Sequence, residues 1–294
     1  MTTEAVCWVS RGLVLGGGGP VGRAWQTGLM SAALEHGLDL DAADLIVGTS
    51  AGAIVGAELA LGLDLRAVLP SPTPSQASVA PSRPDAAIMA MIGRAATSSD
   101  PDEARRRIGV AALEAETPDE TAAMDRPNVA AMRGVPWPPR FTATAVSITT
   151  GRLVLLDESS GASLQQALAA SSALPGVWPP ITIGSDRYID GGVRSSLNVD
   201  AAVGADRVLV ISCHSVGGTG GRPGVLAEEI ETARRQEVGV EVVAPDEVFL
   251  SLTDGGRDLL NPGLEAPAFE AGRRQWDVEA DRVKAFWAGN ADHR

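Results

Sequence analysis

A serine between two glycines carries the first chemical signal in this sequence. Gly48-Thr49-Ser50-Ala51-Gly52 follows the apolar run Leu45-Ile46-Val47 and precedes an Ala- and Leu-rich stretch. A G-x-S-x-G turn between a strand and a helix exposes the serine hydroxyl, and its flanking glycines let strand and helix approach closely. We therefore predict that Ser50 is a nucleophile, with Gly48 and Gly52 shaping its turn. A tight turn with an N-capping serine is the alternative.

Four consecutive glycines form the second signal. Gly16 to Gly19 follow the apolar run at 12–15 and lead into a helical pattern. The spacing also fits G-x-G-x-x-G, a dinucleotide-binding fingerprint that expects an acidic residue at the end of the second strand, where this chain has Gly48-Thr49-Ser50. We therefore predict that the N–H groups of Gly17, Gly18 and Gly19 form an oxyanion hole. Nucleotide binding and a ligand-free glycine turn are the alternatives.

Asp190 supplies the third signal, because it ends a short strand pattern just before Gly191-Gly192. A carboxylate within hydrogen-bonding distance of a serine hydroxyl can accept its proton. We predict a Ser50–Asp190 dyad, and an isolated Asp-Gly turn is the alternative. Because an ordinary aspartate is a weak base, we expect its surroundings to raise its pKa, or the oxyanion loop to contribute more to catalysis.

The three histidines bear on a rival mechanism. A conventional Ser-His-Asp α/β-hydrolase esterase needs a histidine after the acid in the chain. His36 comes too early and His293 lies at the chain end, so His214 is the candidate base for that alternative. A third hypothesis is a non-catalytic protein that binds an acyl group or acts as a scaffold.

The elements that must position these residues alternate along the chain. We predict strands over 12–15, 44–47, 141–148, 153–156, 188–189, 207–212 and 240–243. We predict helices over 25–36, 53–61, 86–96, 101–116, 118–133, 163–172, 199–203, 256–260 and 267–287. The initial strand–helix–strand–helix order predicts an α/β fold with parallel pairing.

One domain over residues 1–294 is expected, with a helical and loop insertion at about 66–138 that lies over the active-site edge of the sheet. Residues 70–84 are rich in Pro, Ser and Ala and predict a loop. The apolar helix at 86–96 contains Met89, Met91 and Ile92, which either line an acyl channel, touch a lipid surface or, as we favour, pack on the core.

The composition of the chain limits the partners that we expect it to bind. The net charge of -13 disfavours nucleic acid and anionic membranes but not a neutral or zwitterionic lipid. Cys7 and Cys213 provide neither metal-site spacing nor a disulfide framework, so we expect no metal, no cofactor and a reducing cytoplasm. No signal-peptide pattern and no apolar run of about 18 residues is present, so any contact with a membrane is expected to be peripheral.

Taken in order, the three motifs resemble those of the patatin-like phospholipase family. Further stretches are similar to it, namely Phe141-Thr142-Ala143-Thr144-Ala145, Ala169 to Gly176, and Tyr188 to Val193. The resemblance covers residues 11 to 62 and 139 to 212. It implies a three-layer α/β/α fold with a mainly parallel central sheet. It also implies a phospholipase A-like or lysophospholipase-like esterase that forms an acyl-enzyme on Ser50, with Asp190 as base.

One departure concerns the glycine loop. The family pattern G-G-G-x-R-G places an arginine where this chain has Val21, and Arg23 follows two residues later. Either the role of that arginine is lost or Arg23 takes it over. Donation by backbone N–H groups does not depend on the side chain.

Overall fold

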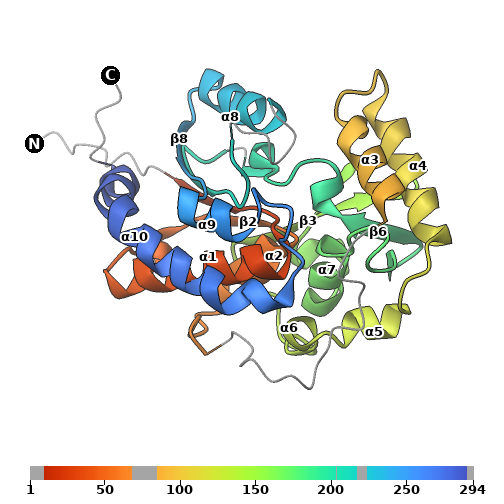
Figure 1. The fold of residues 1–294 in the computed structure, drawn as a ribbon, viewed down its shortest axis with the longest axis horizontal. Helices are drawn as coiled ribbons and strands as arrows, with labels where there is room; N and C mark the ends of the chain where they lie inside the picture. The colour runs from red at the N-terminus through yellow and green to blue at the C-terminus, as the bar shows by residue number, and fades with distance from the viewer. Residues whose placement is uncertain (1–9, 68–84, 203, 217–223, 290–294) are drawn as a thin grey trace, which may run out of the picture.

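The computed structural model describes residues 10–67, 85–202, 204–216 and 224–289 (Figure 1). Within these residues eight strands form one mixed sheet. Strands that are neighbours in the order β5-β6-β3-β2-β1-β7-β8 are hydrogen-bonded to each other, and β4 also pairs with β3. The strands are β1 (Arg11–Leu15), β2 (Leu45–Thr49), β3 (Phe141–Ser147), β4 (Leu153–Leu156), β5 (Ile181–Ile183), β6 (Asp186–Asp190), β7 (Arg207–Ile211) and β8 (Gly239–Val243). The pairs among β3, β2, β1, β7 and β8 are parallel, and those of β4, β5 and β6 are antiparallel.

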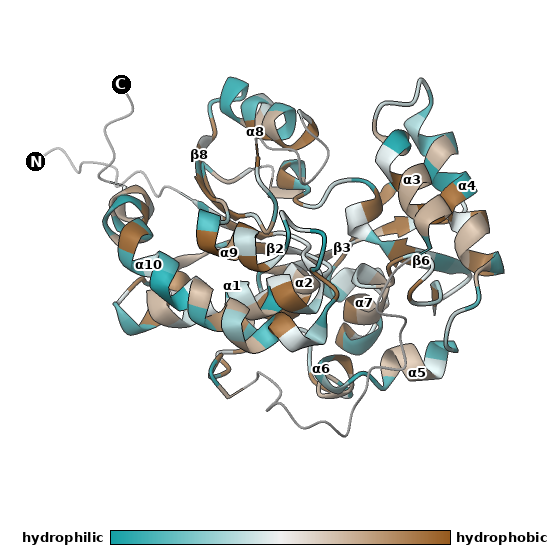
Figure 2. Cartoon of the chain, in the orientation of Figure 1, coloured by the Kyte–Doolittle hydropathy of each residue, from teal (hydrophilic) through white to brown (hydrophobic). Residues whose placement is uncertain are grey.

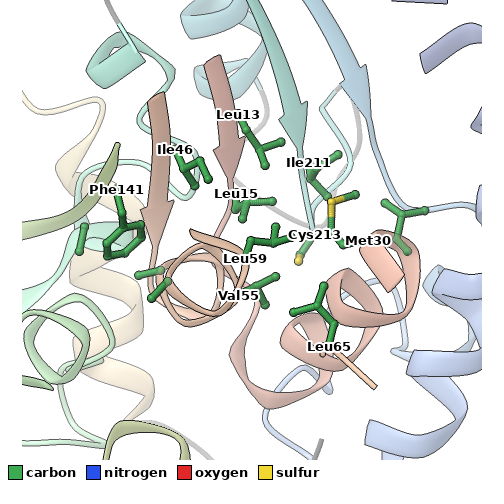
Figure 3. Packing of buried hydrophobic residues seen from close by; sticks show 14 of the residues in the cluster. Leu13, Leu15, Met30, Ile46, Val55, Leu59, Leu65, Phe141, Ile211 and Cys213 are labelled. Carbon is green, nitrogen blue, oxygen red and sulfur yellow. The ribbon is translucent and has the colours of Figure 1, made fainter. Parts of the chain in front are cut away.

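One face of the sheet forms the larger core. Alternate residues of a strand point to opposite faces, so Leu13, Leu15 and Ile211 lie together on this side. They pack against α1 (Gly19–Glu35) and α2 (Ala51–Ala60), as Figure 3 shows. Further buried residues of the same cluster come from other helices, among them α7 (Leu164–Ser171), α9 (Glu247–Leu252) and α10 (Glu265–Ala288).

Helices also cover the opposite face. Val14 and Val210 pack with residues of α8 (Val225–Arg235). Val146 and Ile189 pack with α3 (Ala86–Ala95) and α4 (Pro101–Glu114), which lie together beside β6 (Figure 1). Figure 2 shows hydrophilic and hydrophobic residues alternating along α8 and α10, as expected for helices with one face on a core. The predicted three-layer α/β/α fold is confirmed.

The insertion differs in detail from its prediction. The helix expected over 118–133 is two short helices, α5 (Glu120–Met124) and α6 (Pro127–Ala130), which both contact α7. They are separated because Pro127 lacks an N–H, and the residue before a proline avoids helical torsion angles; Arg126 has ψ 133°. In α3, Ile88 and Ile92 are buried in the core while Met89 is exposed. The loop expected over 70–84 lies outside the described residues.

Other element predictions were wrong towards the carboxyl end. No helix forms at 256–260, because Gly255 and Gly256 adopt positive φ angles of 66° and 90°. Helix α9 forms earlier and is capped by Asp246, whose side chain accepts the N–H of Phe249 at 2.8 Å. The helix expected over 199–203 is a 3₁₀ helix, Val199–Ala202. Strand β5 and helix α8 were not predicted. Among the described helices, none is long and apolar enough to cross a membrane.

Candidate active site

The carboxyl ends of β2 and β6 meet along one side of β3. Thr49, the last residue of β2, pairs with Thr144, and Asp190, the last residue of β6, pairs with the adjacent Ala145. Strand β4 pairs with residues of β3 that also pair with β2 and with β6, so it occupies the other side. The backbone register therefore brings Ser50, the residue after β2, next to Asp190.

The turn at Ser50 is strained and tightly packed. Ser50 has φ 54° and ψ −117°, an unfavourable conformation for a residue with a side chain. A Cβ atom at Gly52 would lie 2.1 Å from the carbonyl oxygen of Leu15, and one at Gly48 would lie 2.3 Å from the Cα of Ala53. Strand and helix therefore approach too closely for any residue but glycine at either position, which is the geometry expected of a nucleophile turn.

The carboxyl end of α7 and the residues just after it hold both members of the predicted dyad. The backbone N–H of Ser50 donates to Oγ of Ser171 at 2.9 Å. The backbone N–H of Asp190 donates to the carbonyl oxygen of Ala173 at 3.0 Å. Ser171 is fully buried, so its hydroxyl supports the strained serine turn from the interior. The sequence resemblance marked this stretch but gave Ser171 no role.

The surroundings of Asp190 favour a proton acceptor. Its side chain is 3% exposed, and this burial raises its pKa to about 6. Three interactions with the ionised carboxylate oppose that rise: a hydrogen bond from the Ser50 side chain, another from the Gly192 N–H (2.7 Å to Oδ1) and the charge of Arg126. The carboxylate is thus ionised near neutral pH while being a stronger base than an ordinary aspartate. This meets the expectation of a raised pKa.

The glycine loop lies against the serine. A Cβ atom on Gly17 would lie 3.3 Å from the Cβ of Ser50. However, the N–H of Gly17 already donates to the carbonyl oxygen of Ser196 at 2.8 Å, so its prediction as a free oxyanion donor needs correction. The N–H groups of Gly18 and Gly19 have no protein acceptor within the part of the chain that the structure describes. Of the three predicted oxyanion donors, only the N–H groups of Gly18 and Gly19 remain as candidates.

Arg23 has a partner inside the protein. Its guanidinium forms an ion pair with Glu58 of α2 at 2.6 Å, and the two residues are 5% and 2% exposed. Burial raises the pKa of Glu58, and the charge of Arg23 opposes that rise. Arg23 therefore links α1 to α2, and its charge is compensated by a carboxylate. Of the two outcomes left open for the family's loop arginine, this arrangement favours the loss of its role.

Among the residues that the structure describes, no histidine acts on Asp190. The groups that act on this carboxyl are Ser50, Gly192 and Arg126 among the described residues, and none is an imidazole. His214 follows β7, which is separated from β2 by β1, and its backbone N–H donates to Oγ of Ser212. His293 and Cys7 lie outside the described residues. In the described ranges, no group of three or more His, Cys, Asp or Glu side chains is arranged to hold a metal ion.

A buried amide joins the strand of the serine to the loop of the aspartate. Nδ2 of Asn198 donates to Oγ1 of Thr49 at 3.1 Å and to the carbonyl oxygen of Ser195 at 2.7 Å. Thr49 and Thr144 also share a hydrogen bond of 2.8 Å between their hydroxyls. Sequence reasoning missed this network, since a single asparagine eight residues beyond Asp190 carries no spacing signal.

Several solved structures are similar to this chain at low sequence identity. VipD from Legionella pneumophila is 13% identical over 94% of this chain and 67% of its own, with a TM-score of 0.47. The type III effector protein ExoU is 18% identical over 94% and 53%, with a TM-score of 0.40. ExoU of Pseudomonas aeruginosa, in complex with SpcU, is 19% identical over 91% and 53%, with a TM-score of 0.36. This chain thus spans about half to two thirds of those chains.

The family follows from the sequence profile. The family described as patatin-like phospholipase matches residues 13–203, which is more than half of the chain. The chain therefore belongs to the patatin-like phospholipase family, a family of lipid hydrolases. No curated protein gives a match.

Proposed function

We propose that this protein hydrolyses carboxylic esters of lipids, as a phospholipase A-like or lysophospholipase-like esterase, through a Ser50–Asp190 dyad and an acyl-enzyme. The observation that carries the proposal is the buried Asp190 carboxyl, whose pKa is raised to about 6 and which accepts a hydrogen bond from Ser50. Family membership supports the lipid ester as the class of substrate. The strained Ser50 turn supports its role as nucleophile.

The proposed reaction has two halves. Asp190 accepts the hydroxyl proton as Oγ of Ser50 attacks the ester carbonyl carbon, and the N–H groups of Gly18 and Gly19 stabilise the oxyanion. The tetrahedral intermediate collapses to the acyl-enzyme, while the proton on Asp190 passes to the departing alcohol. A water molecule then gives a proton to Asp190 and attacks the acyl carbonyl. The fatty acid leaves, and the proton returns to Ser50.

The charge of the protein bears on the lipid it meets. A net charge of -13 repels anionic bilayers, so a neutral or zwitterionic lipid is the favoured substrate class. We place the enzyme in the cytoplasm, in peripheral contact with lipid. A raised aspartate pKa near the nucleophile favours this enzymatic role over a non-catalytic scaffold.

Hydrolysis of a panel of p-nitrophenyl esters and lysophospholipids tests the proposal. Wild type should turn over members of the panel, and Ser50→Ala should lower kcat/KM by about 10³-fold or more. Asp190→Asn should cause a comparable loss, while His214→Ala should retain activity. Full activity in Ser50→Ala refutes the assignment. Loss of activity in a folded His214→Ala protein favours the Ser-His-Asp alternative.

A further inference from the structure

Arg126 ties the insertion to the segment after α7. It precedes α6, and its Nε donates to the carbonyl oxygen of Ala123 at 2.8 Å. Its Nη2 donates to Oγ of Ser172 at 2.9 Å. The guanidinium also lies over the ring of Trp178, 4.7 Å from the ring centroid. The side chain is therefore held by three different groups, although the residue lies in the short connection between α5 and α6.

The segment that this guanidinium contacts is the one that holds the dyad. Ser172 lies between Ser171, which accepts the backbone N–H of Ser50, and Ala173, which accepts the backbone N–H of Asp190. Both dyad residues thus have their backbone fixed within one residue of the arginine contact. A shift of this segment would displace nucleophile and base relative to one another, and small misplacements of reacting groups are costly in rate.

The same guanidinium is the cation that acts on the Asp190 carboxyl among the described residues. Burial lowers the pKa of Arg126 to about 10, so it stays protonated near neutral pH. Other charged groups of the neighbouring segments are engaged elsewhere. Asp186, at the other end of β6, accepts hydrogen bonds from hydroxyls of the β3–β4 hairpin. Arg194, in the loop after β6, forms an ion pair with Asp200.

We propose that Arg126 is a positioning residue of the active site: the insertion supplies a guanidinium that fixes the 171–173 segment, to which the backbones of Ser50 and Asp190 are bonded, and places a positive charge near the buried Asp190. This inference rests on the proposed Ser50–Asp190 mechanism. Ionising a carboxyl away from water is unfavourable, and a nearby positive charge offsets part of that cost. Removal of the charge should therefore raise the pKa of Asp190. The insertion is then part of the catalytic apparatus and not only a cover over the sheet.

The test is the pH dependence of kcat/KM on a short-chain p-nitrophenyl ester, an uncharged substrate that does not itself respond to the arginine. Four variants are compared with wild type: Arg126→Gln, Arg126→Met, Arg126→Lys and Arg133→Gln. Arg133 is a matched control, because it lies just beyond α6 and forms an exposed ion pair with Asp125. Thermal unfolding identifies the variants that are folded.

In the uncharged variants, the acidic limb of the profile should move upward by about 1 pH unit, and the high-pH plateau should fall by up to about 10-fold. Arg126→Lys should keep the limb near its wild-type position and lower only the plateau, since it keeps the charge but loses the planar contacts. Arg133→Gln should match wild type in both.

Three results would overturn the inference while wild type is active. The first is an acidic limb that does not move in a folded uncharged variant. The second is a limb that moves as far in Arg126→Lys as in the uncharged variants. The third is an unchanged plateau in all three Arg126 variants. The lysine variant keeps the test decisive if glutamine and methionine prevent folding. An inactive wild type would instead count against the proposed function itself, so the two failures are distinguishable.

Discussion

At the scale of single residues, Asp190 combines deep burial with a role that needs a negative charge. Its pKa of about 6 reflects a balance in which burial outweighs the hydrogen bond from Ser50, the N–H of Gly192 and the charge of Arg126. The motif search located Ser50 and Asp190 because each type of residue sits in a recognisable glycine context. It missed Ser171 and Asn198, whose roles depend on contacts between segments far apart in the chain.

The pKa of Asp190 sets the pH range of activity. A base must be ionised to accept the proton of Ser50, so kcat/KM should rise with pH, reach half its maximum near pH 6 and level off about 1 unit higher. Stopped-flow or steady-state hydrolysis of a neutral ester measures this profile. A half-maximum near pH 4, the value of an ordinary aspartate, would show that burial does not tune this carboxyl.

The same burial should cost stability. The pKa of Asp190 is higher in the folded state than in the unfolded state, so protonation of this carboxyl stabilises the fold. That contribution to the free energy of unfolding is fully present below the unfolded-state pKa of about 4 and is lost as pH rises through about 6. Asp190→Asn removes the buried charge, so at about pH 8 it should raise the free energy of unfolding by roughly 1–3 kcal/mol.

Urea unfolding at about pH 8 and pH 4 measures this effect, and the gain should shrink at the lower pH. If Asp190→Asn were less stable than wild type at both pH values, the Asp190 carboxyl would stabilise the fold and the prediction would be wrong.

At the scale of elements, hydrophobic pattern predicted most strands and the long helices, because each buries one face. The errors have local causes: Pro127 divides one expected helix, and Gly255 and Gly256 prevent another. Helix α8 buries only Leu226 and Ile230 with Ala233, a sparse i, i+4, i+7 signal among charged residues. The conformation of the loop after β6 is set by hydrogen bonds to residues far away in the chain, and the local sequence pattern does not reveal these bonds.

Two glycines offer a matched test of the turn that carries Ser50. Gly52→Ala would place a Cβ atom 2.1 Å from a backbone oxygen of β1, so it should abolish activity and lower the unfolding temperature. Gly93→Ala, at an exposed position of α3, meets nothing within 4 Å and should stabilise by up to about 1 kcal/mol with normal activity. Calorimetry measures the stability of both variants, and ester hydrolysis measures their activity. Wild-type behaviour of Gly52→Ala would contradict the tight strand–helix contact.

At the scale of the whole molecule, the order of strands was the part least accessible to sequence. Pattern alone did not reveal that β6 runs antiparallel to β3 and meets β2 end to end. The family resemblance did place Ser50 and Asp190 in one site, and the resemblance itself is confirmed over residues 13–203. The buried pair of Arg23 and Glu58, by contrast, arises only when α1 and α2 pack together.

This ion pair makes a prediction about the assembled fold. Arg23→Met leaves Glu58 buried without its partner and should cost about 3–5 kcal/mol, whereas Arg23→Met combined with Glu58→Leu should be far closer to wild type. Urea unfolding of the two variants and of Glu58→Leu closes the cycle. If the double variant lost the sum of the two single losses, the carboxylate and guanidinium would not be coupled.

Covalent labelling with a fluorophosphonate, followed by mass mapping, tests the Ser50–Asp190 dyad most directly. We predict a single modified residue, Ser50, with a labelling rate that rises with pH through about 6 and falls by about 10²-fold or more in Asp190→Asn. Ser50→Ala should take up no label. Modification of a different serine in the folded protein, or an undiminished rate in Asp190→Asn, would contradict the account.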